Sequence, residues 1–148
     1  MVIDVIKLIH SGKTQIDFSF DYSSKAEILT YGAVIDGPIN VTGTLELHEG
    51  EVYVDGEISC NIVGKCARCL EDTKYSFATS FSVKYVRSNP NDEDNEYLYK
   101  SGKVDLSQAV DEHMLLNVPT IIYCKEDCKG LCPICGCNLN NNDCDCKY

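Results

Sequence analysis

Ten cysteines in a chain of 148 residues constrain this fold more than any other feature of the sequence. Two pairs of them have the CxxC spacing, Cys66 with Cys69 and Cys132 with Cys135. A tight turn at such a pair directs two thiolates at one metal ion, and Gly136 permits the left-handed backbone that closes the second turn. Each pair supplies two ligands of a tetrahedral site, so each predicted site requires two more.

The amino-terminal residues decide how these cysteines are interpreted. Polar or charged side chains at Asp4, Lys7 and His10 interrupt any apolar segment of a signal peptide. No run of about eighteen apolar residues occurs, so a membrane-spanning helix is not expected either. We therefore expect a cytoplasmic protein, in which clustered thiols bind metal more often than they form disulfides.

The remaining tail cysteines complete two predicted zinc sites. The short segment between Cys135 and Cys144 closes at little entropic cost, so one site is predicted to be local to the tail. The other site joins the first CxxC pair to Cys124 and Cys128 and would tie the sheet to the tail. The predicted ligands are Cys66, Cys69, Cys124 and Cys128 for site 1, and Cys132, Cys135, Cys144 and Cys146 for site 2.

The spacing of the cysteines alone also allows other metal-binding arrangements. A single site that combines Cys132 and Cys135 with any two neighbours is the main rival, and an iron–sulfur cluster is another. Cys60 is expected in the core, and Cys137 as a free surface thiol or an alternative ligand. Four thiolates leave zinc no open position, and no nucleophile elbow, phosphate loop or HExxH motif occurs. No enzymatic activity is therefore expected.

Apolar and polar residues alternate with the period of a β-strand from Pro38 to Val86. The predicted strands cover residues 15–22, 41–47, 52–62 and 75–85, and residues 2–9 offer another. We expect an α+β fold, predominantly an antiparallel β-sheet, as a meander or a partly closed barrel, with one C-terminal helix and a zinc-binding tail.

Acidic residues dominate the charge of the chain, whose formal net charge is −10. The densest run, from Asp92 to Glu96, falls within residues 88–97, a polar stretch without apolar periodicity that predicts a solvated loop. A strongly negative chain opposes nonspecific nucleic-acid binding, which depends on cations that neutralise phosphates. It favours basic partners, including basic proteins.

A helix is predicted over about residues 105–117, capped by Asp105 or Ser107 and ended by Pro119. Its predicted buried face consists of Leu106, Val110, Met114 and Leu115, with Asp111 and Glu112 on the outer face. The predicted units are a β-rich domain over residues 1–123 and a cysteine-rich zinc-binding tail over residues 124–148, packed on that domain.

Three segments of the chain resemble the bacterial YceD-like family, the large ribosomal RNA subunit accumulation proteins. They are CARCLE at 66–71, DLSQAVDEHMLLNVP at 105–119 and CKEDCKGLCPICGCNLN at 124–140. The last segment looks like the cysteine-rich tail of Gram-positive members, although Cys137 stands where a small residue is usual. Some relatives lack the extended tail but keep the CxxC pair and a cysteine or histidine pair after the helix, which implies that site 1 is the core metal site.

The resemblance implies a role in ribosome biogenesis, in the accumulation or maturation of large-subunit ribosomal RNA, without an established catalytic activity. The implied partners are ribosomal RNA or the pre-ribosomal large subunit, and basic ribosomal proteins; no membrane and no small-molecule substrate is expected. The candidate RNA contacts are the cations beside site 1, Lys65, Arg68, Lys125 and Lys129. Their alternative role is to compensate the thiolate charge. The alternative function is an acidic adaptor that binds basic proteins or a nuclease without contacting RNA.

Overall fold

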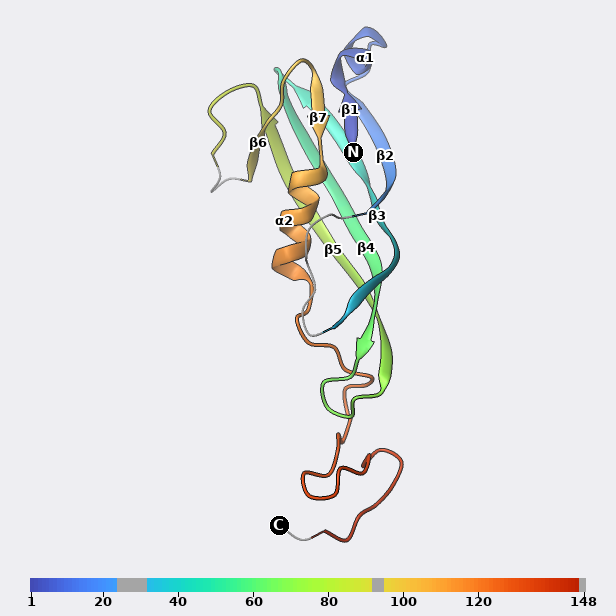
Figure 1. Cartoon of the computed structure of the whole chain (residues 1–148). Coiled ribbons are helices and arrows are strands. Elements are labelled where there is room, and N and C mark those ends of the chain that lie inside the picture. The colour runs from blue at the N-terminus through green and yellow to red at the C-terminus, as the bar shows by residue number, and fades with distance from the viewer. Residues whose placement is uncertain (24–31, 92–94, 147–148) are drawn as a thin grey trace.

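The computed structural model describes residues 1–23, 32–91 and 95–146, and Figure 1 shows a long twisted sheet with a helix against it and the cysteine-rich tail at one end. The strands are β1 (Val2–Asp4), β2 (Gln15–Tyr22), β3 (Val34–His48), β4 (Glu51–Lys65), β5 (Asp72–Val86), β6 (Glu96–Leu98) and β7 (Lys103–Asp105), and the helices are α1 (Val5–His10) and α2 (Ser107–Asn117). One sheet has the order β2-β3-β4-β5-β6, and β1 and β7 form a second.

The strands pair in an antiparallel manner except at β6, which runs parallel to the end of β5. The expected α+β fold, with a mainly antiparallel sheet and a C-terminal helix, is therefore confirmed, and both sheets are open. The central strands extend beyond the alternating segments because pairing continues to the site 1 end of the sheet, where Val34 faces Val63 and Lys65 faces Asp72. An irregularity between Asp36 and Asn40 interrupts the β3–β4 register.

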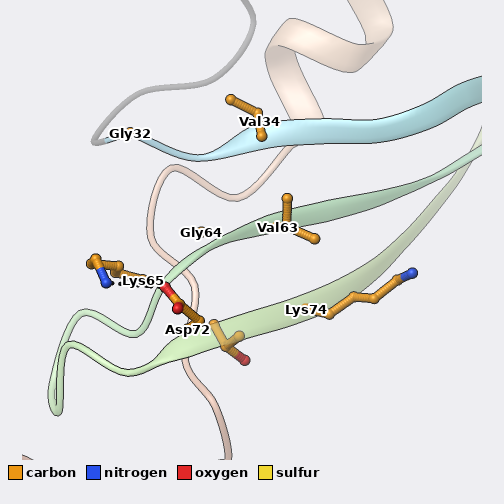
Figure 2. Close-up of a pocket in the computed structure, with 8 residues that line it drawn as sticks. Gly32, Val34, Val63, Gly64, Lys65, Asp72 and Lys74 are labelled. Atoms are coloured by element: carbon orange, nitrogen blue, oxygen red, sulfur yellow. Dashed lines mark hydrogen bonds and ion pairs between the residues drawn. The ribbon is translucent and has the colours of Figure 1, made fainter.

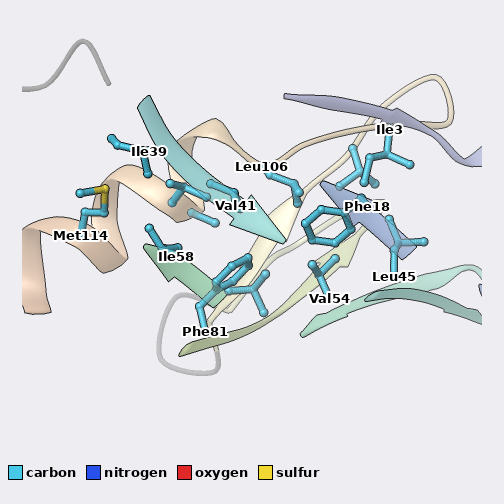
Figure 3. Close-up of a cluster of buried hydrophobic side chains, with 14 of the residues drawn as sticks. Ile3, Phe18, Ile39, Val41, Leu45, Val54, Ile58, Phe81, Leu106 and Met114 are labelled. Atoms are coloured by element: carbon cyan, nitrogen blue, oxygen red, sulfur yellow. The ribbon is translucent and has the colours of Figure 1, made fainter. Parts of the chain in front are cut away.

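Side-chain alternation assigns one face of the main sheet to the core, as the sequence predicts. On β4 the buried residues are Val52, Val54, Ile58, Cys60 and Ile62, and on β5 they are Phe77, Phe81, Val83 and Tyr85. Figure 3 shows Met114 and Leu106 from the helix side approaching Ile58, Val41 and Phe81 of the sheet. The core therefore lies between this face, α2 and the small β1–β7 sheet.

Helix α2 begins and ends where the sequence indicates. The Asp105 carboxylate accepts a 3.0 Å hydrogen bond from the Ser107 amide, and Val118, which precedes Pro119, is extended with ψ 129°. Val110 and Met114 are buried, but the expectation for Leu115 is wrong, because its side chain is 63% exposed. Leu115 follows Met114 directly and so points about 100° away from the buried stripe.

Of the two acids expected on the outer face of α2, Glu112 is exposed and Asp111 is half-buried, and both accept hydrogen bonds from strand side chains. Asp111 accepts a 3.0 Å hydrogen bond from the Tyr22 hydroxyl of β2, and Glu112 accepts one of 2.6 Å from Tyr97 of β6. These two bonds connect the helix to strands at opposite edges of the five-stranded sheet.

Two boundaries at the ends of strands differ from the expectations. Residues 2–9 contain only the three-residue strand β1, because Asp4 caps α1 by accepting hydrogen bonds from the Ile6 and Lys7 amides, and Val5 and Leu8 are buried at helical spacing. The acidic loop expected over 88–97 ends early, since β6 begins at Glu96. Its residues 92–94 lie outside the described part of the chain.

Two glycines that face each other across β3 and β4 make room for aromatic rings. Gly43 is paired with Gly56, and the ring of Phe18 lies over the first while that of Phe81 lies over the second. A Cβ atom at Gly56 would be 2.7 Å from both the Phe81 ring and the Thr42 carbonyl oxygen. The space above this glycine is therefore filled.

Replacing Gly56 with alanine is expected to lower the free energy of unfolding by about 1–3 kcal/mol, because the new methyl group overlaps Phe81 and backbone that cannot move away. Urea denaturation of the metal-loaded protein measures the change. Ser80→Ala is the matched control on the exposed side of β5, with an expected change within about 0.5 kcal/mol. Equal midpoints for Gly56→Ala and the wild type would contradict the packing argument.

Candidate metal centres

The hairpin between β4 and β5 presents the first pair of thiols. Its turn is closed by a 2.8 Å hydrogen bond from the Cys66 amide to the Glu71 carbonyl and one of 3.0 Å from the Leu70 amide to the Cys66 carbonyl. Leu70 adopts a left-handed conformation with φ 59°. The Ala67 amide donates to the Ile122 carbonyl at 3.0 Å, which brings the segment after α2 against the hairpin.

This contact completes a group of four sulfurs at site 1. Cys66, Cys69, Cys124 and Cys128 have Sγ atoms that all lie within 4.8 Å of one another. The Cys66–Cys128 sulfur distance is 3.8 Å and the Cys69–Cys124 distance is 3.6 Å. A regular tetrahedron with zinc–sulfur bonds of about 2.3 Å has edges of about 3.8 Å. The donor set therefore fits a zinc ion, whereas a disulfide requires about 2.05 Å.

The environment of Cys66 favours a thiolate. Burial alone would raise its pKa, but the amides of Cys69, Cys124 and Arg68 donate to the sulfur and leave the pKa lowered to about 6. Cys66, Cys69 and Cys128 are buried and Cys124 is exposed. Site 1 is thus a largely enclosed sulfur site with at least one ligand ready to ionise at neutral pH.

Two of the four candidate RNA-contacting cations have structural partners. The Arg68 guanidinium donates to the carbonyls of Glu126 at 3.1 Å and Cys128 at 3.2 Å, and lies 4.6 Å from the centre of the Tyr123 ring. This contact holds the segment that carries Cys128 against the hairpin.

Lys65 forms a 3.0 Å ion pair with Asp72 at the edge of a hollow of about 550 Å³, shown in Figure 2. Lys125 and Lys129 are exposed and have no ion-pair partner within residues 1–23, 32–91 and 95–146. Of the four candidate cations, these two remain available to a ligand.

Site 2 is formed entirely within the tail. Cys132, Cys135, Cys144 and Cys146 have Sγ atoms within 4.8 Å of one another, so the structure brings together the same two sets of cysteines that the spacing favours. The Gly136 amide donates to the Cys132 carbonyl at 2.9 Å, and its φ of 73° is the left-handed conformation that this turn requires. Hydrogen bonds from the Cys135 and Ile134 amides lower the pKa of Cys132 to about 6.

Three asparagines that the cysteine spacing does not reveal connect the two sites. The Asn140 side chain donates to the Cys128 sulfur at 3.3 Å and accepts from the Lys129 amide at 3.0 Å. Asn138 and Asn141 both donate to the Glu71 carboxylate, at 2.7 and 3.2 Å. The sequence signal for them is the four asparagines within residues 138–142, which lie between the tail cysteines.

The two remaining cysteines differ in their surroundings. Cys60 is buried in the core, as expected. Cys137 is partly exposed beside site 2, where hydrogen bonds with Cys135, burial and the Cys144 thiol raise its pKa to about 12. The structure therefore places Cys137 next to a metal ligand set and not at a separate location.

Together these features define a β-sheet protein with a cysteine-rich tail that contains two four-sulfur groups, each able to hold a metal ion. Among the described residues, no helix combines the length and the apolar character needed to cross a membrane.

The family model described as large ribosomal RNA subunit accumulation protein YceD matches residues 54–148, and the chain belongs to this family. The matched range contains all eight cysteines of the two sulfur groups.

Relatives of the chain come from several bacteria. The uncharacterized protein Rv2926c of Mycobacterium tuberculosis is 25% identical over 147 residues, which cover 92% of this chain and 69% of the relative. The uncharacterized protein YlbN of Bacillus subtilis is 28% identical over 99 residues, which cover 65% of this chain and 58% of YlbN. ML1660 of Mycobacterium leprae, also uncharacterized, is 28% identical over 120 residues, 76% of this chain and 52% of the relative. No solved structure matches the chain significantly.

Proposed function

We propose that this protein is a non-catalytic factor of ribosome biogenesis, held together by two structural zinc ions, that supports the accumulation or maturation of large-subunit ribosomal RNA. The observation that carries the proposal is the family match over residues 54–148, because that family is described by large ribosomal RNA subunit accumulation. The match covers most of β4, all of β5, β6, β7 and α2, and the tail up to residue 148.

The chemistry of the two sulfur groups supports a structural role for the metal. Each group offers four thiols, which fill the tetrahedral shell of zinc and leave no position for a water molecule or a substrate. Zinc would bind the eight cysteines of sites 1 and 2 and supply cross-links between the hairpin, the segment after α2 and the tail. The sulfur distances of 3.6 and 3.8 Å in site 1 suit metal ligands and not a disulfide, which supports a location in the reducing cytoplasm.

The proposal is tested in cells that lack the protein and carry a plasmid copy. Loss of the protein is expected to lower the ratio of large-subunit to small-subunit ribosomal RNA, and the wild-type copy to restore it. A Cys66→Ser copy is expected to restore it poorly, because site 1 loses a ligand, whereas Cys60→Ala is the control because Cys60 belongs to neither sulfur group. An unchanged ribosomal RNA ratio in cells that lack the protein would refute the proposal.

A second candidate function, an acidic adaptor for basic proteins, is favoured by the open face of the main sheet. Asp17 and Asp21 of β2 and Asp55 and Glu57 of β4 are exposed there, on the side opposite the core. Such a surface attracts cationic protein segments. Ribonuclease treatment of pre-ribosomal particles distinguishes the two: a factor held by RNA is released, and an adaptor held by ribosomal proteins stays bound.

A further inference from the structure

Positive charge is concentrated at the end of the molecule that α1 and the β6–β7 turn form, although the whole chain is acidic. Figure 1 shows this end opposite the cysteine-rich tail. Its exposed cations are Lys7, Lys13, Arg87, Lys100 and Lys103. We call this set the α1-end cations.

Backbone contacts hold the segments that carry these cations next to one another. Asp4 of β1 is paired with Lys103 of β7, and the Val5 amide donates to the Gly102 carbonyl at 2.8 Å. The Ile6 side chain lies so close to Gly102 that a Cβ atom there would overlap it. A glycine is therefore required where α1 packs on the turn, and the segments that carry the cations lie next to one another at this end of the molecule.

The four lysines among the α1-end cations are not neutralised by the protein. Within the described ranges, no ion pair or side-chain hydrogen bond engages their ammonium groups. The only carboxylate within residues 1–13 and 99–104 is Asp4, and its oxygen already accepts the two amide hydrogen bonds that cap α1. The charge of this surface is thus available to an anionic partner.

Arg87 is held in place by a short chain of hydrogen bonds. Its Nε atom donates to the Tyr99 hydroxyl at 3.0 Å, and that hydroxyl donates to the Gly50 carbonyl at 2.6 Å. The terminal guanidinium nitrogens have no hydrogen-bond partner within the described residues. Glu49, Glu51 and Glu96 line the same hollow as Arg87, and the last two of these carboxylates are paired with Lys84. An arginine oriented in this way is suited to bidentate contact with a phosphate.

A groove of about 460 Å³ lies at this end of the molecule and is lined by two of the α1-end cations. These cations are Arg87 and Lys100, and the lining also includes the side chains of Ile6 and Ile9, which are 44% and 49% exposed. An apolar wall beside fixed cations accommodates an unstacked base while its phosphates contact the cations.

We propose that the α1-end cations and this groove bind a single-stranded segment of RNA. This inference rests on the proposed role in large-subunit ribosomal RNA accumulation and adds the place of contact. The unneutralised lysines, the oriented Arg87 and the apolar groove match a polyanion that also carries flat apolar bases. The contact lies at the opposite end from the tail that carries Lys125 and Lys129, two of the four candidate RNA contacts named from the sequence.

The inference is tested by fluorescence anisotropy of the zinc-loaded protein with a labelled, unstructured RNA oligonucleotide at several salt concentrations. Lys100→Gln with Lys103→Gln, and separately Lys7→Gln with Lys13→Gln, are each expected to weaken binding roughly tenfold at low salt. Each pair is also expected to make the dependence of log K on log salt shallower by about 1 to 2. Lys125→Gln with Lys129→Gln is the matched control and is expected to leave both quantities unchanged.

The alternative outcomes separate this inference from the proposed function. Weaker binding only in the Lys125 and Lys129 variant would overturn the inference and leave an RNA-contacting factor. Binding of the wild-type protein to phosphatidylglycerol vesicles but not to RNA would overturn it in favour of a membrane surface. Failure to bind either probe would also overturn it. The ribosomal RNA ratio in cells that lack the protein tests the proposed function independently of these binding results.

Discussion

Replacing Cys128 with serine is expected to remove one of the two metal ions and to release the tail from the β4–β5 hairpin. Cys128 is buried, lies 3.8 Å from the Cys66 sulfur and accepts the hydrogen bond from Asn140. Apparent binding free energies of structural zinc are about 10–16 kcal/mol. The ion therefore contributes most of the free energy that holds the tail against the β4–β5 hairpin. Loss of one of four thiolates leaves the site unable to retain it.

Two measurements check this expectation. Elemental analysis of protein purified without added metal is expected to give about two zinc ions per wild-type chain and about one per Cys128→Ser chain. Amide hydrogen exchange is expected to become faster at Ala67, which donates to Ile122, and at Leu131, which donates to Arg68. The central strands keep their protection, because the core between β4, β5 and α2 contains none of the four ligands.

Cys60→Ser is the control for the loss of any buried cysteine. Cys60 is as buried as Cys128 but lies in the sheet core, so this variant is expected to be less stable and to retain both zinc ions. A wild-type protein with about one zinc ion would contradict the two-site assignment. Iron in place of zinc would contradict the metal assignment while leaving the ligand sets unchanged.

The sequence predicts the main sheet well because its information is local. Apolar strand residues such as Val54 and Ile58 are each flanked by polar or exposed neighbours. This period of two predicts both that the segment is a β-strand and which of its side chains are buried. The same reasoning fails at residues 5–10, where a six-residue helix has no long apolar repeat and depends on the Asp4 cap. It also fails at Leu115, since four apolar residues on a helix do not all fit one narrow stripe.

The cysteine groups were predictable for a different reason. The CxxC spacing of a pair such as Cys66 and Cys69 already indicates that both sulfurs can bind one metal ion. Only the choice of the two pairs that share an ion depends on residues far apart in the chain. The roles of Arg68 and Asn140 could not be predicted, because each depends on the distance between segments far apart in the chain. The α1-end cations were missed for the same reason: Lys7, Arg87 and Lys103 come together only after the strands pair.

A strong chelator is expected to remove the two zinc ions in two separate phases, with site 2 emptied first. At site 1 only Cys124 is exposed, whereas at site 2 Cys135 is exposed and Cys144 and Cys146 are partly exposed. Site 1 is also covered by Arg68 on the backbone of Cys128 and by the Asn140 amide on its sulfur. Contacts of this kind around ligands change metal affinity by about 10–100-fold, so release from site 1 is expected to be at least about tenfold slower.

The phases are followed with a chromophoric chelator while circular dichroism reports on the sheet. The fast phase is expected to leave the β-sheet signal unchanged. The hydrogen bonds described between the tail and the sheet, from Leu131 to Arg68 and from the asparagines to Glu71, all reach the β4–β5 hairpin at the site 1 end. Cys146→Ser is the matched control: it lacks a site 2 ligand and is expected to show the slow phase alone. A fast phase that persists in this variant would show that site 1 is the accessible site, and the argument from burial would then be wrong.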